Sequence, residues 1–325
     1  MGLMGNLKHN GTITFSAALV KSLAADVGFT ACGIARAESL SDSEFPLREW
    51  LSHGLHADMG YMQRNAEMRQ DPRLLVEGAR SIISLLVAYK PDRRMEGPVR
   101  IAQYAYGTDY HERLKQMLYS LMQRIAGAYE GFEGRPFVDT APISDRHWAA
   151  RAGLGWIGHN TLLVNPQWGS YCFIGELVTT AEADCYDSPS PDGCGDCRRC
   201  VDACPNGAIV RMEGAGSFQV DARRCTSYNT IENRNPSLPP SLDRRGYSFG
   251  CDICQLACPY NEQAPAATTL DDERKQLLEQ LPDADKGAFR RFTKHSPLNR
   301  ITYEQWLRNI GRGEPNGDPK TKTEE

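Results

Sequence analysis

A repeated cysteine pattern constrains this chain more than any other feature. Residues 194–209 read CGDCRRCVDACPNGAI, in which four cysteines follow the spacing C-x2-C-x2-C-x3-C and a proline comes next. Residues 250–261 read GCDICQLACPYN, the same run with one cysteine fewer. In bacterial ferredoxins this run binds 4Fe–4S clusters. Cys225 stands alone between the two runs and completes a set of eight cysteines, the number of ligands that two such clusters need.

The ferredoxin arrangement also predicts which cysteines share a cluster, because the fourth cysteine of each run ligates the other cluster. A first cysteine set is then Cys194, Cys197, Cys200 and Cys258, and a second cysteine set is Cys204, Cys225, Cys251 and Cys254. The prolines after the crossing cysteines, Pro205 and Pro259, are suited to the first turn of a short helix, where no N–H is needed. Structural zinc sites also use C-x2-C pairs and are the alternative. Zinc ribbons, however, have no use for the third and fourth cysteine and the proline.

Composition describes an ordinary globular protein in a reducing environment. With 325 residues the chain is long enough for two or three domains. Hydrophobic residues make up 41% and charged residues 24%, as is usual for soluble proteins. Three of the eleven cysteines, Cys32, Cys172 and Cys185, fall outside the pattern and are expected to be free thiols. Free thiols and thiolate ligands fit a reducing compartment, where disulfides are rare.

No targeting or membrane signal stands out. The N-terminal residues lack a charged segment leading into an apolar one, and they contain no twin-arginine pair. No stretch approaches the roughly 20 apolar residues of a membrane span. We therefore expect a cytoplasmic protein that does not enter a membrane. The formal net charge of −4 gives no global indication of nucleic-acid binding.

The first 180 residues alternate between helical and strand patterns. SIISLLVAY (81–89) is apolar and β-branched and predicts a buried strand. A long helix is predicted after a cap at Thr108 or Asp109, since apolar residues recur at helical spacing at Leu114, Leu118, Leu121 and Ile125. Similar patterns predict helices at 15–27, 47–55, 59–68 and 144–152 and strands at 29–35, 137–138, 161–165 and 170–180. The alternation favours an α/β, or α+β, fold for this part.

The rest of the chain divides into two further parts. A turn-rich stretch, DSPSPDG (187–193), leads into the cysteine-rich part, so we predict a ferredoxin-like domain over residues 181–265. Residues 266–325 are predicted to form a basic helical segment, with helical patterns at 270–281 and 289–312 and a frayed polar tail. Gly153, Gly155 and Gly158 match G-x-G-x-x-G, but no strand precedes them and no acidic residue is placed to hold a ribose. They are better explained by a tight turn or by close approach of the backbone to a large planar cofactor.

Several short strings resemble one known family. VDTAP (138–142), AGLGWIG (152–158) with NTLL (160–163), and CTSYNTIE (225–232) resemble epoxyqueuosine reductases in order and spacing. YGTDYH (106–111) and FRRFTKHSPLNR (289–300) are similar to that family as well. The resemblance covers about residues 15–310. It corresponds to the short form of the family, without the helical-repeat domain that longer members add, and the family is related to reductive dehalogenases.

The resemblance implies a fold, a reaction and cofactors. Residues 1–180 would form a cobalamin-binding catalytic domain like that of reductive dehalogenases. The enzyme would remove the epoxide oxygen of epoxyqueuosine at the wobble position of tRNA, the last step of queuosine biosynthesis. Electrons from an unidentified low-potential donor would pass through the two clusters to cobalt. The implied partners are the anticodon loop of tRNA and that donor, and we expect a monomer.

Asp139 is the implied proton donor, because it occupies the place of the family's acid in VDTAP. We expect enclosure between the cofactor and the nucleoside to raise the pKa of this carboxyl, so that it stays protonated near neutrality. The alternative is that Asp139 only caps the turn before Pro142.

Other positions are implied to contact cobalamin. Proteins that ligate cobalt through histidine usually carry D-x-H-x-x-G, and the stretches that begin at Asp109 and Asp145 lack the glycine. Cobalamin is therefore expected with its base displaced and without a histidine ligand, and His111 and His147 are expected on a helix surface or in hydrogen bonds. Besides Asp139, the implied contacts are Arg64, Arg146, His159, Asn160, Thr161, Ser227, Tyr228 and Asp252. His159 departs from the family, which usually has lysine there, so its role stays open.

Binding of tRNA would depend on local charge. Four arginine pairs, 198–199, 223–224, 244–245 and 290–291, with Lys294, Arg300 and Arg308, predict a phosphate-binding surface. Tyr104, Tyr106 and Trp168 are candidates for stacking on the exposed base. Two other functions remain. A dehalogenase acting on a small organohalide would share the cofactors, and a plain electron-transfer module would leave the first 180 residues unexplained.

Overall fold

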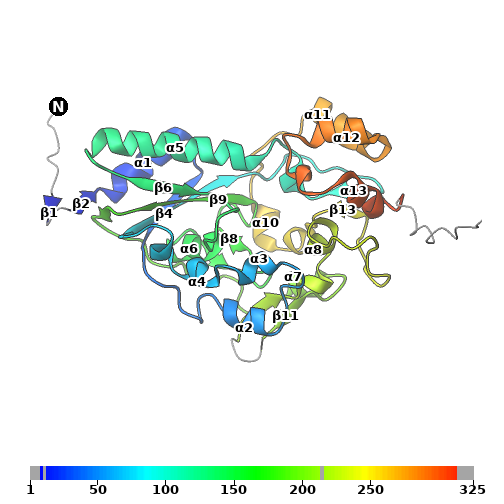
Figure 1. Cartoon of the computed structure of the whole chain (residues 1–325), viewed down its shortest axis with the longest axis horizontal. Helices are drawn as coiled ribbons and strands as arrows, with labels where there is room; N and C mark the ends of the chain where they lie inside the picture. The colour runs from blue at the N-terminus through cyan, green and yellow to red at the C-terminus, as the bar shows by residue number, and fades with distance from the viewer. Residues whose placement is uncertain (1–7, 10–11, 213–215, 313–325) are drawn as a thin grey trace, which may run out of the picture.

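A four-stranded sheet forms the centre of the first part of the molecule (Figure 1). The computed structural model describes residues 8–9, 12–212 and 216–312. The sheet order is β3 (Ala31–Arg36), β4 (Ser81–Ala88), β9 (Cys172–Thr179) and β6 (Gly134–Phe137). All neighbouring strands are antiparallel, so this part is α+β. The alternation of helices and strands was predicted correctly, but alternation does not fix strand direction, which depends on the end at which the chain re-enters the sheet.

Two helices cover one face of this sheet, as Figure 1 shows. They are α1 (Ala17–Val27), which ends at Gly28 with φ 102°, and α5 (Tyr110–Ala128), which the Asp109 side chain caps. The predicted apolar stripe of α5 is fully buried. In α1 the buried residues are Ala17, Val20 and Ala24, whereas Leu19 is 36% exposed. The helix predicted at 15–27 is therefore confirmed, although it begins two residues later.

The opposite face carries shorter elements. These are α2 (Leu47–Ser52), α3 (Gly60–Gln63), α4 (Ala66–Gln70), η1 (Pro72–Leu74), α6 (Asp145–Arg151) and the hairpin of β7 (Trp156–Ile157) and β8 (Leu163–Val164). A small sheet at the far end joins β1 (Lys8–His9), β2 (Thr12–Phe15) and β10 (Glu182–Ala183). The three glycines of G-x-G-x-x-G lie in the turns around β7. A Cβ at Gly155 would lie 2.1 Å from the carbonyl oxygen of Val164, so the pattern serves a tight turn.

The cysteine-rich segment consists of short elements separated by loops. They are α7 (Arg199–Ala203), β11 (Ile209–Arg211), β12 (Phe218–Val220), η3 (Ala222–Arg224), α8 (Thr226–Ile231), α9 (Ile253–Leu256) and α10 (Pro259–Gln263). Pro259 starts α10 as predicted. Pro205 instead starts a turn, because Gly207 adopts φ 54° two residues later and the chain continues into β11.

Buried Asn261 joins this segment to the central domain. Its side-chain oxygen accepts a hydrogen bond from the Ser170 backbone N–H at 2.6 Å, and its amide nitrogen donates to Ser170 Oγ at 2.8 Å. Gln255 donates to the Ser170 carbonyl at 3.1 Å. A Cβ on Gly169 would lie 2.0 Å from the Asn261 side-chain oxygen, so this approach requires glycine.

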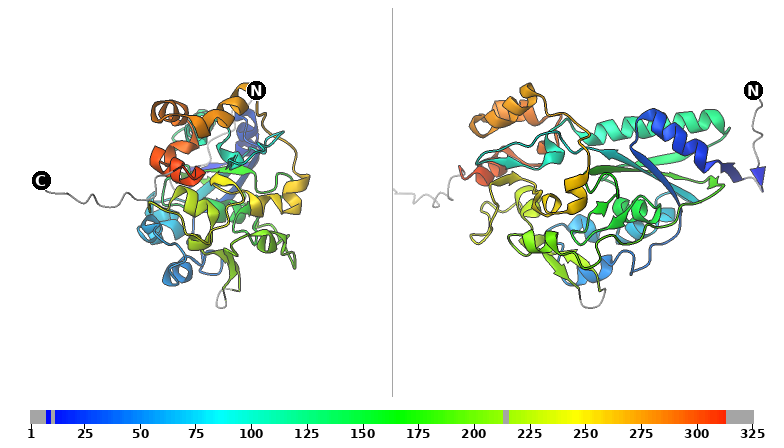
Figure 2. Two further views of the ribbon diagram at one scale, coloured as in Figure 1. Left: turned by 90° about the vertical axis from the view of Figure 1, so that its right-hand side faces the viewer. Right: turned by 180° about the vertical axis from the view of Figure 1, so that it is seen from behind.

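Helices at the end of the described chain form a separate lobe (Figure 2). They are α11 (Asp272–Gln280), η4 (Leu281–Asp283), α12 (Lys286–Thr293), η5 (Pro297–Arg300) and α13 (Tyr303–Ile310). Their core includes Phe249 of β13 (Tyr247–Phe249), which pairs in parallel with β5 (Arg100–Ile101) beside η2 (Gln103–Ala105). The core of the lobe thus also includes residues that precede the predicted C-terminal segment, which begins at residue 266. The predicted helix over 289–312 is interrupted before Pro297, and the predicted polar tail lies outside the described residues.

None of the helices within the described ranges is both long enough and apolar enough to cross a membrane.

The contact between α5 and β9 is expected to contribute strongly to stability. Leu118 is fully buried, and its side chain packs directly over Gly175. We predict that Leu118→Ala lowers the free energy of unfolding by about 2–5 kcal/mol, because it leaves a cavity in a rigid core. Tyr119→Ala, next in sequence but 50% exposed, should cost less than about 1 kcal/mol. Denaturant unfolding of both variants checks this, and equal losses would contradict it.

Candidate active site

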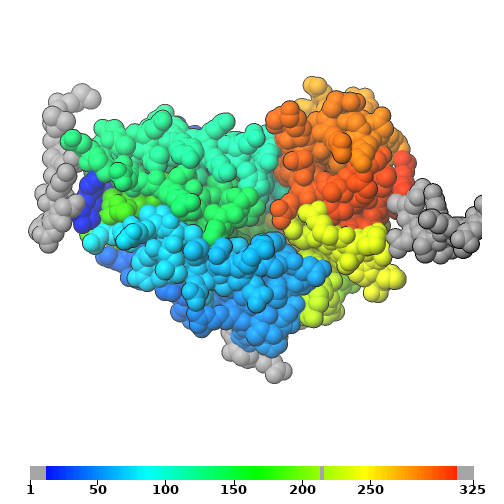
Figure 3. Space-filling model, viewed as in Figure 1, coloured from blue at the N-terminus to red at the C-terminus, as the bar shows by residue number. Residues whose placement is uncertain are grey.

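A cavity of about 1410 Å³ lies between the central domain, the cysteine-rich segment and the C-terminal lobe. Its lining comes from α3 and α4, the start of α5, the loop before α6, the β7–β8 hairpin, α8, α9 and η5. In the space-filling view, the blue to cyan segment that contains α2–α4 lies beside the yellow and orange parts of the chain (Figure 3). The volume exceeds the roughly 300–1,000 Å³ of sites for drug-sized ligands, so the cavity can hold a larger group.

Asp139 projects into this cavity from the loop between β6 and α6. Its backbone has φ 43°, which is unusual for aspartate, and its side chain is 58% exposed. Tyr110 donates a hydrogen bond to Asp139 Oδ2 at 3.0 Å, and His111 Nε2 lies 3.1 Å from the same oxygen. His111 Nδ1 lies 2.7 Å from Asp109 Oδ1. A chain of hydrogen bonds therefore runs from Asp109 through His111 to Asp139.

These partners hold the pKa of Asp139 below its ordinary value. Burial acts to raise the pKa of this carboxyl, but the hydrogen bond and charge of His111, the Tyr110 hydroxyl and the charge of Arg146 outweigh it, so the pKa is lowered. A raised pKa is expected of a carboxyl enclosed between cofactor and nucleoside, and it stays a prediction. No pattern in the sequence indicated that two side chains of α5 would reach the same carboxylate oxygen.

A second carboxyl in the cavity went unnoticed in the sequence. Asp145 opens α6, and burial raises its pKa to about 6, although Arg146 opposes the shift. The negative charge of Asp139 adds to the increase. The environments thus push the pKa values of Asp139 and Asp145 apart, an arrangement typical of acid–base sites. The stretch D-x-H without glycine gave no indication of this pair.

Most of the predicted cofactor contacts line this cavity. Arg146 donates to the Thr161 carbonyl at 2.5 Å, and Tyr228 donates to Asp58 Oδ2 at 2.9 Å. Asp252 is buried and accepts from the backbone N–H of Gln103 at 2.9 Å. The lining residues among those predicted are Arg64, Asp139, Arg146, Asn160, Thr161, Ser227, Tyr228 and Asp252.

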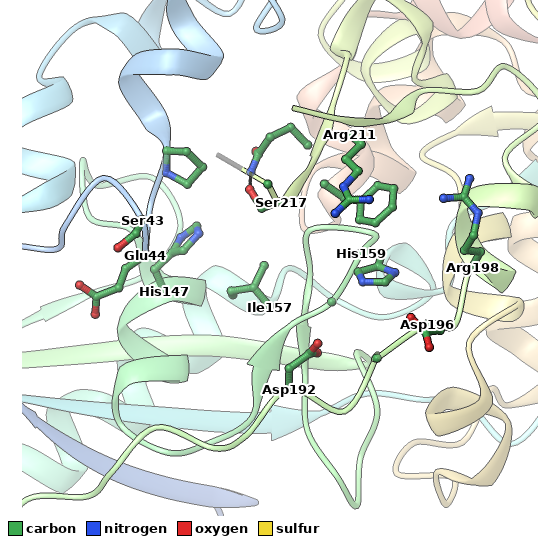
Figure 4. Close-up of a pocket in the computed structure, with 16 residues that line it drawn as sticks. Ser43, Glu44, His147, Ile157, His159, Asp192, Asp196, Arg198, Arg211 and Ser217 are labelled. Atoms are coloured by element: carbon green, nitrogen blue, oxygen red, sulfur yellow. Dashed lines mark hydrogen bonds between the residues drawn. The ribbon is translucent and has the colours of Figure 1, made fainter. Parts of the chain in front are cut away.

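His159 faces a different space. It lines a smaller cavity of about 460 Å³, together with Arg198 and Arg211 (Figure 4). Its Nδ1 lies 2.8 Å from the carbonyl oxygen of Cys197, and its ring packs on Phe218 at 4.3 Å. The two cavities share lining residues such as Ile157. His159 is therefore the predicted cofactor contact that the structure places apart from the others.

The two histidines of the D-x-H stretches both form hydrogen bonds, as expected. His111 joins the chain described above, and His147 Nδ1 lies 2.7 Å from Ser144 Oγ with its ring against Phe45. Burial lowers the pKa of His147 to about 3, so this ring is neutral.

The two cysteine sets lie in different surroundings. All four members of the second set line the large cavity, whereas no member of the first set does. Burial, then the nearby thiols of Cys194, Cys258 and Cys197, raise the pKa of Cys200 to about 11. Burial raises the pKa of Cys251 to about 12, with Cys225 and Cys204 contributing. The pKa of each of these two thiols is thus raised in part by other members of its own predicted set. Across the described residues, no three His, Cys, Asp or Glu side chains gather as ligands of a single metal ion.

Most of the basic residues predicted to bind phosphate have partners within the chain, and Arg300 pairs with Glu232 at 3.0 Å. Arg198, Arg199, Arg223 and Arg245 pair with carboxylates at 2.7–3.6 Å, namely those of Asp202, Glu262, Asp221 and Asp243. Arg244 and Arg308 donate to backbone carbonyls inside the fold. Among the described residues, no ion pair involves Arg290, Arg291 or Lys294. Of the proposed stacking residues, Tyr104 lines the large cavity, whereas Tyr106 is buried and Trp168 lies elsewhere.

Comparisons with known proteins identify both parts of the chain. A family model described as epoxyqueuosine reductase QueG, DUF1730, matches residues 69–140. A model of a 4Fe–4S double cluster binding domain matches residues 193–261, which favours iron–sulfur clusters over zinc. Epoxyqueuosine reductase of Leadbetterella byssophila is 39% identical over 297 residues, covering 90% of this chain and 96% of that protein. The Pseudomonas aeruginosa protein of the same name is 37% identical, covering 90% and 83%.

Solved structures agree. Epoxyqueuosine reductase from Streptococcus thermophilus aligns with a TM-score of 0.80 and 30% identity over 90% of this chain and 79% of that one. The Bacillus subtilis structure, with its catalytic aspartate loop swung out of the active site, aligns with a TM-score of 0.76 and 26% identity over the same shares. A third, with an epoxyqueuosine-modified tRNA stem loop, aligns with a TM-score of 0.76 and 27% identity. With the fold, the double-cluster segment and these relatives in agreement, the chain belongs to the epoxyqueuosine reductases, a family of oxidoreductases.

Proposed function

We propose that this protein reduces epoxyqueuosine at the wobble position of tRNA to queuosine, with cobalamin and two 4Fe–4S clusters as cofactors. The observation that carries the proposal is one cavity that is lined both by Asp139 and by all four cysteines of the second set. Removal of the epoxide oxygen consumes two electrons and two protons and releases water. The cavity is lined both by Asp139 with its hydrogen-bonded partners, which could move a proton, and by predicted cluster ligands.

The residues of the large cavity fit a large cofactor that is rich in amide groups, as cobalamin is. Two buried polar atoms on its wall, Asp252 Oδ1 and Arg69 Nε, have no hydrogen-bond partner among the described residues. Leaving such atoms unpaired is costly, so a ligand that supplies partners is favoured. Arg64, Arg146, Asn160, Thr161, Ser227 and Tyr228 would complete the binding site. Of the described histidines that line the cavity, His147 is held by Ser144 and His111 by two aspartates, so neither would ligate cobalt in this proposal.

The protein's own residues would supply the protons. Cobalamin, when bound, supplies a metal centre that can take up single electrons and deliver them to a substrate carbon. Asp139 would donate the proton to the departing oxygen, and His111 would replace it from the side of Asp109. Binding of cofactor and nucleoside would remove water from the Asp139 carboxyl and raise its pKa towards neutrality. The neutral form needed for donation would then exist only in the filled site.

The arrangement of the cysteine sets supports an order of electron transfer. The second set lines the large cavity, whereas Gly195, Asp196 and Arg198, which lie between cysteines of the first set, line the smaller cavity. Electrons would enter through the cluster of the first set and leave through that of the second. The donor remains to be identified.

Binding of tRNA is supported by the relative solved with a modified stem loop. In this chain, Lys115 lines the large cavity, and Arg290, Arg291 and Lys294 lie on or directly after α12, which leads into η5 at the same cavity. These cations, rather than the four pairs as a whole, would contact phosphates near the reacting base.

Mass analysis of the nucleosides tests the reaction. Anaerobically reconstituted protein, cobalamin, dithionite and tRNA that contains epoxyqueuosine should yield a nucleoside lighter by one oxygen. No loss of mass with clusters and cobalamin fully loaded would contradict the proposal, and activity on an organohalide instead would favour the dehalogenase alternative.

Substitution of the two carboxyl groups should separate their roles. Asp139→Asn removes the group that donates the proton and is predicted to lower kcat by roughly 100- to 10,000-fold. Asp145→Asn, which is nearly isosteric, should reduce kcat by less than about tenfold, since Asp145 lacks the relay to His111. Single-turnover rates on modified tRNA check this, and a larger loss for Asp145→Asn would make that residue the acid.

The pH dependence should depend on Asp109. Burial lowers the pKa of His111, but Asp139 and Asp109 outweigh it, so the pKa lies above 6.5. Protonated His111 is therefore present below this raised pKa and is lost as the pH rises through it. Asp109→Asn removes one of the two carboxylates and should move the basic limb of the kcat profile to lower pH. An unchanged limb would show that His111 does not supply the proton.

Iron content should reflect the division of the cysteines. We predict eight iron atoms per reconstituted chain and about four in Cys225→Ala, because loss of a second-set ligand removes one cluster. Cys185→Ala, which changes a cysteine outside both sets, should keep all eight. Iron and sulfide analysis checks this, and a full complement in Cys225→Ala would remove Cys225 from the ligands.

A further inference from the structure

One thiol of the first cysteine set accepts a hydrogen bond from a tryptophan. Trp156 Nε1 lies 3.3 Å from Cys194 Sγ, and the Trp156 side chain is only 7% exposed. The sulfur of Cys194 therefore accepts a hydrogen bond from a buried side chain before any cluster is considered.

The surrounding residues hold the indole in this position. Trp156 lies in β7, and its ring meets the ring of Tyr260 edge to face at 4.8 Å. Tyr260 donates from its hydroxyl to the Gly193 carbonyl at 3.3 Å. A Cβ at Gly193 would lie 2.4 Å from the Trp156 ring, so only glycine before Cys194 lets the indole approach. The Trp156 indole N–H is thus held against the Cys194 sulfur by residues from three separate segments of the chain.

The hydrogen bonds to the other predicted ligand sulfurs differ from this one. Within the described chain, no other side chain donates a hydrogen bond to any of the eight predicted ligands. Cys204 of the second set accepts one from the Ala208 backbone N–H at 3.2 Å. The indole hydrogen bond therefore distinguishes the first set from the second.

We propose that Trp156 is a positioning residue that raises the reduction potential of the cluster bound by Cys194, Cys197, Cys200 and Cys258. The inference rests on the proposed clusters. A reduced cluster carries one more negative charge than an oxidised one, so a hydrogen bond to a ligand sulfur stabilises the reduced form more. The cluster of the first set would then accept an electron from the donor more readily than it would without the indole.

A redox titration of cobalamin-free protein tests the proposal. After anaerobic reconstitution, iron and sulfide are counted, and the two clusters are titrated with dithionite and followed by electron paramagnetic resonance. In Trp156→Phe the midpoint potential of one cluster should become more negative while that of the other stays unchanged. Unchanged potentials, or equal shifts of both clusters, would overturn the inference.

Trp306→Phe provides a matched control. Trp306 is also buried and donates from its indole to a carbonyl, that of Leu281, at the same distance of 3.3 Å, but it lies in the C-terminal lobe. Both potentials should match the wild type in this variant. A shift as large as that of Trp156→Phe would assign the effect to general loosening of the fold and would overturn the inference.

Isotope labelling keeps the test independent of the variant's folding. Wild-type protein labelled with ¹⁵N in its indoles should show a ¹⁵N hyperfine coupling to one reduced cluster in pulsed spectra. Trp156 is the source expected, because among the described tryptophans it is the one whose indole nitrogen donates to a predicted cluster ligand. Absence of the coupling would overturn the inference. If fewer than eight iron atoms bind, the proposed pair of clusters is contradicted together with the inference. If all eight bind but no coupling appears, only the inference fails and the proposed function stands.

Discussion

The hydrogen bonds between Asn261 and Ser170 hold the cysteine-rich segment against the central domain. Asn261 follows Cys258 by three residues, and Ser170 precedes β9 by two, so this contact ties the end of the second cysteine run to the middle strand of the sheet. The glycine at position 169 allows the approach. Because α9 and α10 are fixed in this way, Cys251 and Cys254 become part of the cavity wall instead of lying on a separate domain.

The cavity is lined both by thiols whose pKa is raised and by a carboxyl, that of Asp139, whose pKa is lowered. Burial raises the pKa of the Cys251 and Cys225 thiols, and neighbouring thiols add to the cost of ionising them. Iron ligation deprotonates the thiols and so offsets the cost of ionising them. Cluster binding would therefore stabilise the folded state of the segment. In the same cavity, the hydrogen bond and charge of His111 help to lower the pKa of Asp139. In the proposed account, the acid thus becomes competent only when the site is filled.

The sequence predicted elements that depend on local pattern and missed those that depend on long-range contacts. The cysteine spacing identified the iron–sulfur segment, and the stripe of Leu114 to Ile125 identified α5, because both signals lie within a few turns of chain. The partners of Asp139 come from a helix about 30 residues earlier, which spacing cannot reveal. The arginine pairs were overvalued for a related reason. A carboxylate such as Asp221 or Asp243, two residues away, neutralises a pair that looks basic in the sequence.

Anomalous diffraction from crystals of the reconstituted protein with cobalamin would test the account most directly. Data collected at the iron and cobalt absorption edges locate each metal without reference to activity. The account predicts two iron clusters, one held by each cysteine set, with cobalt in the large cavity and nearer to the cluster of Cys204, Cys225, Cys251 and Cys254. Cobalt nearer to the cluster of Cys194, or zinc in place of either cluster, would contradict it.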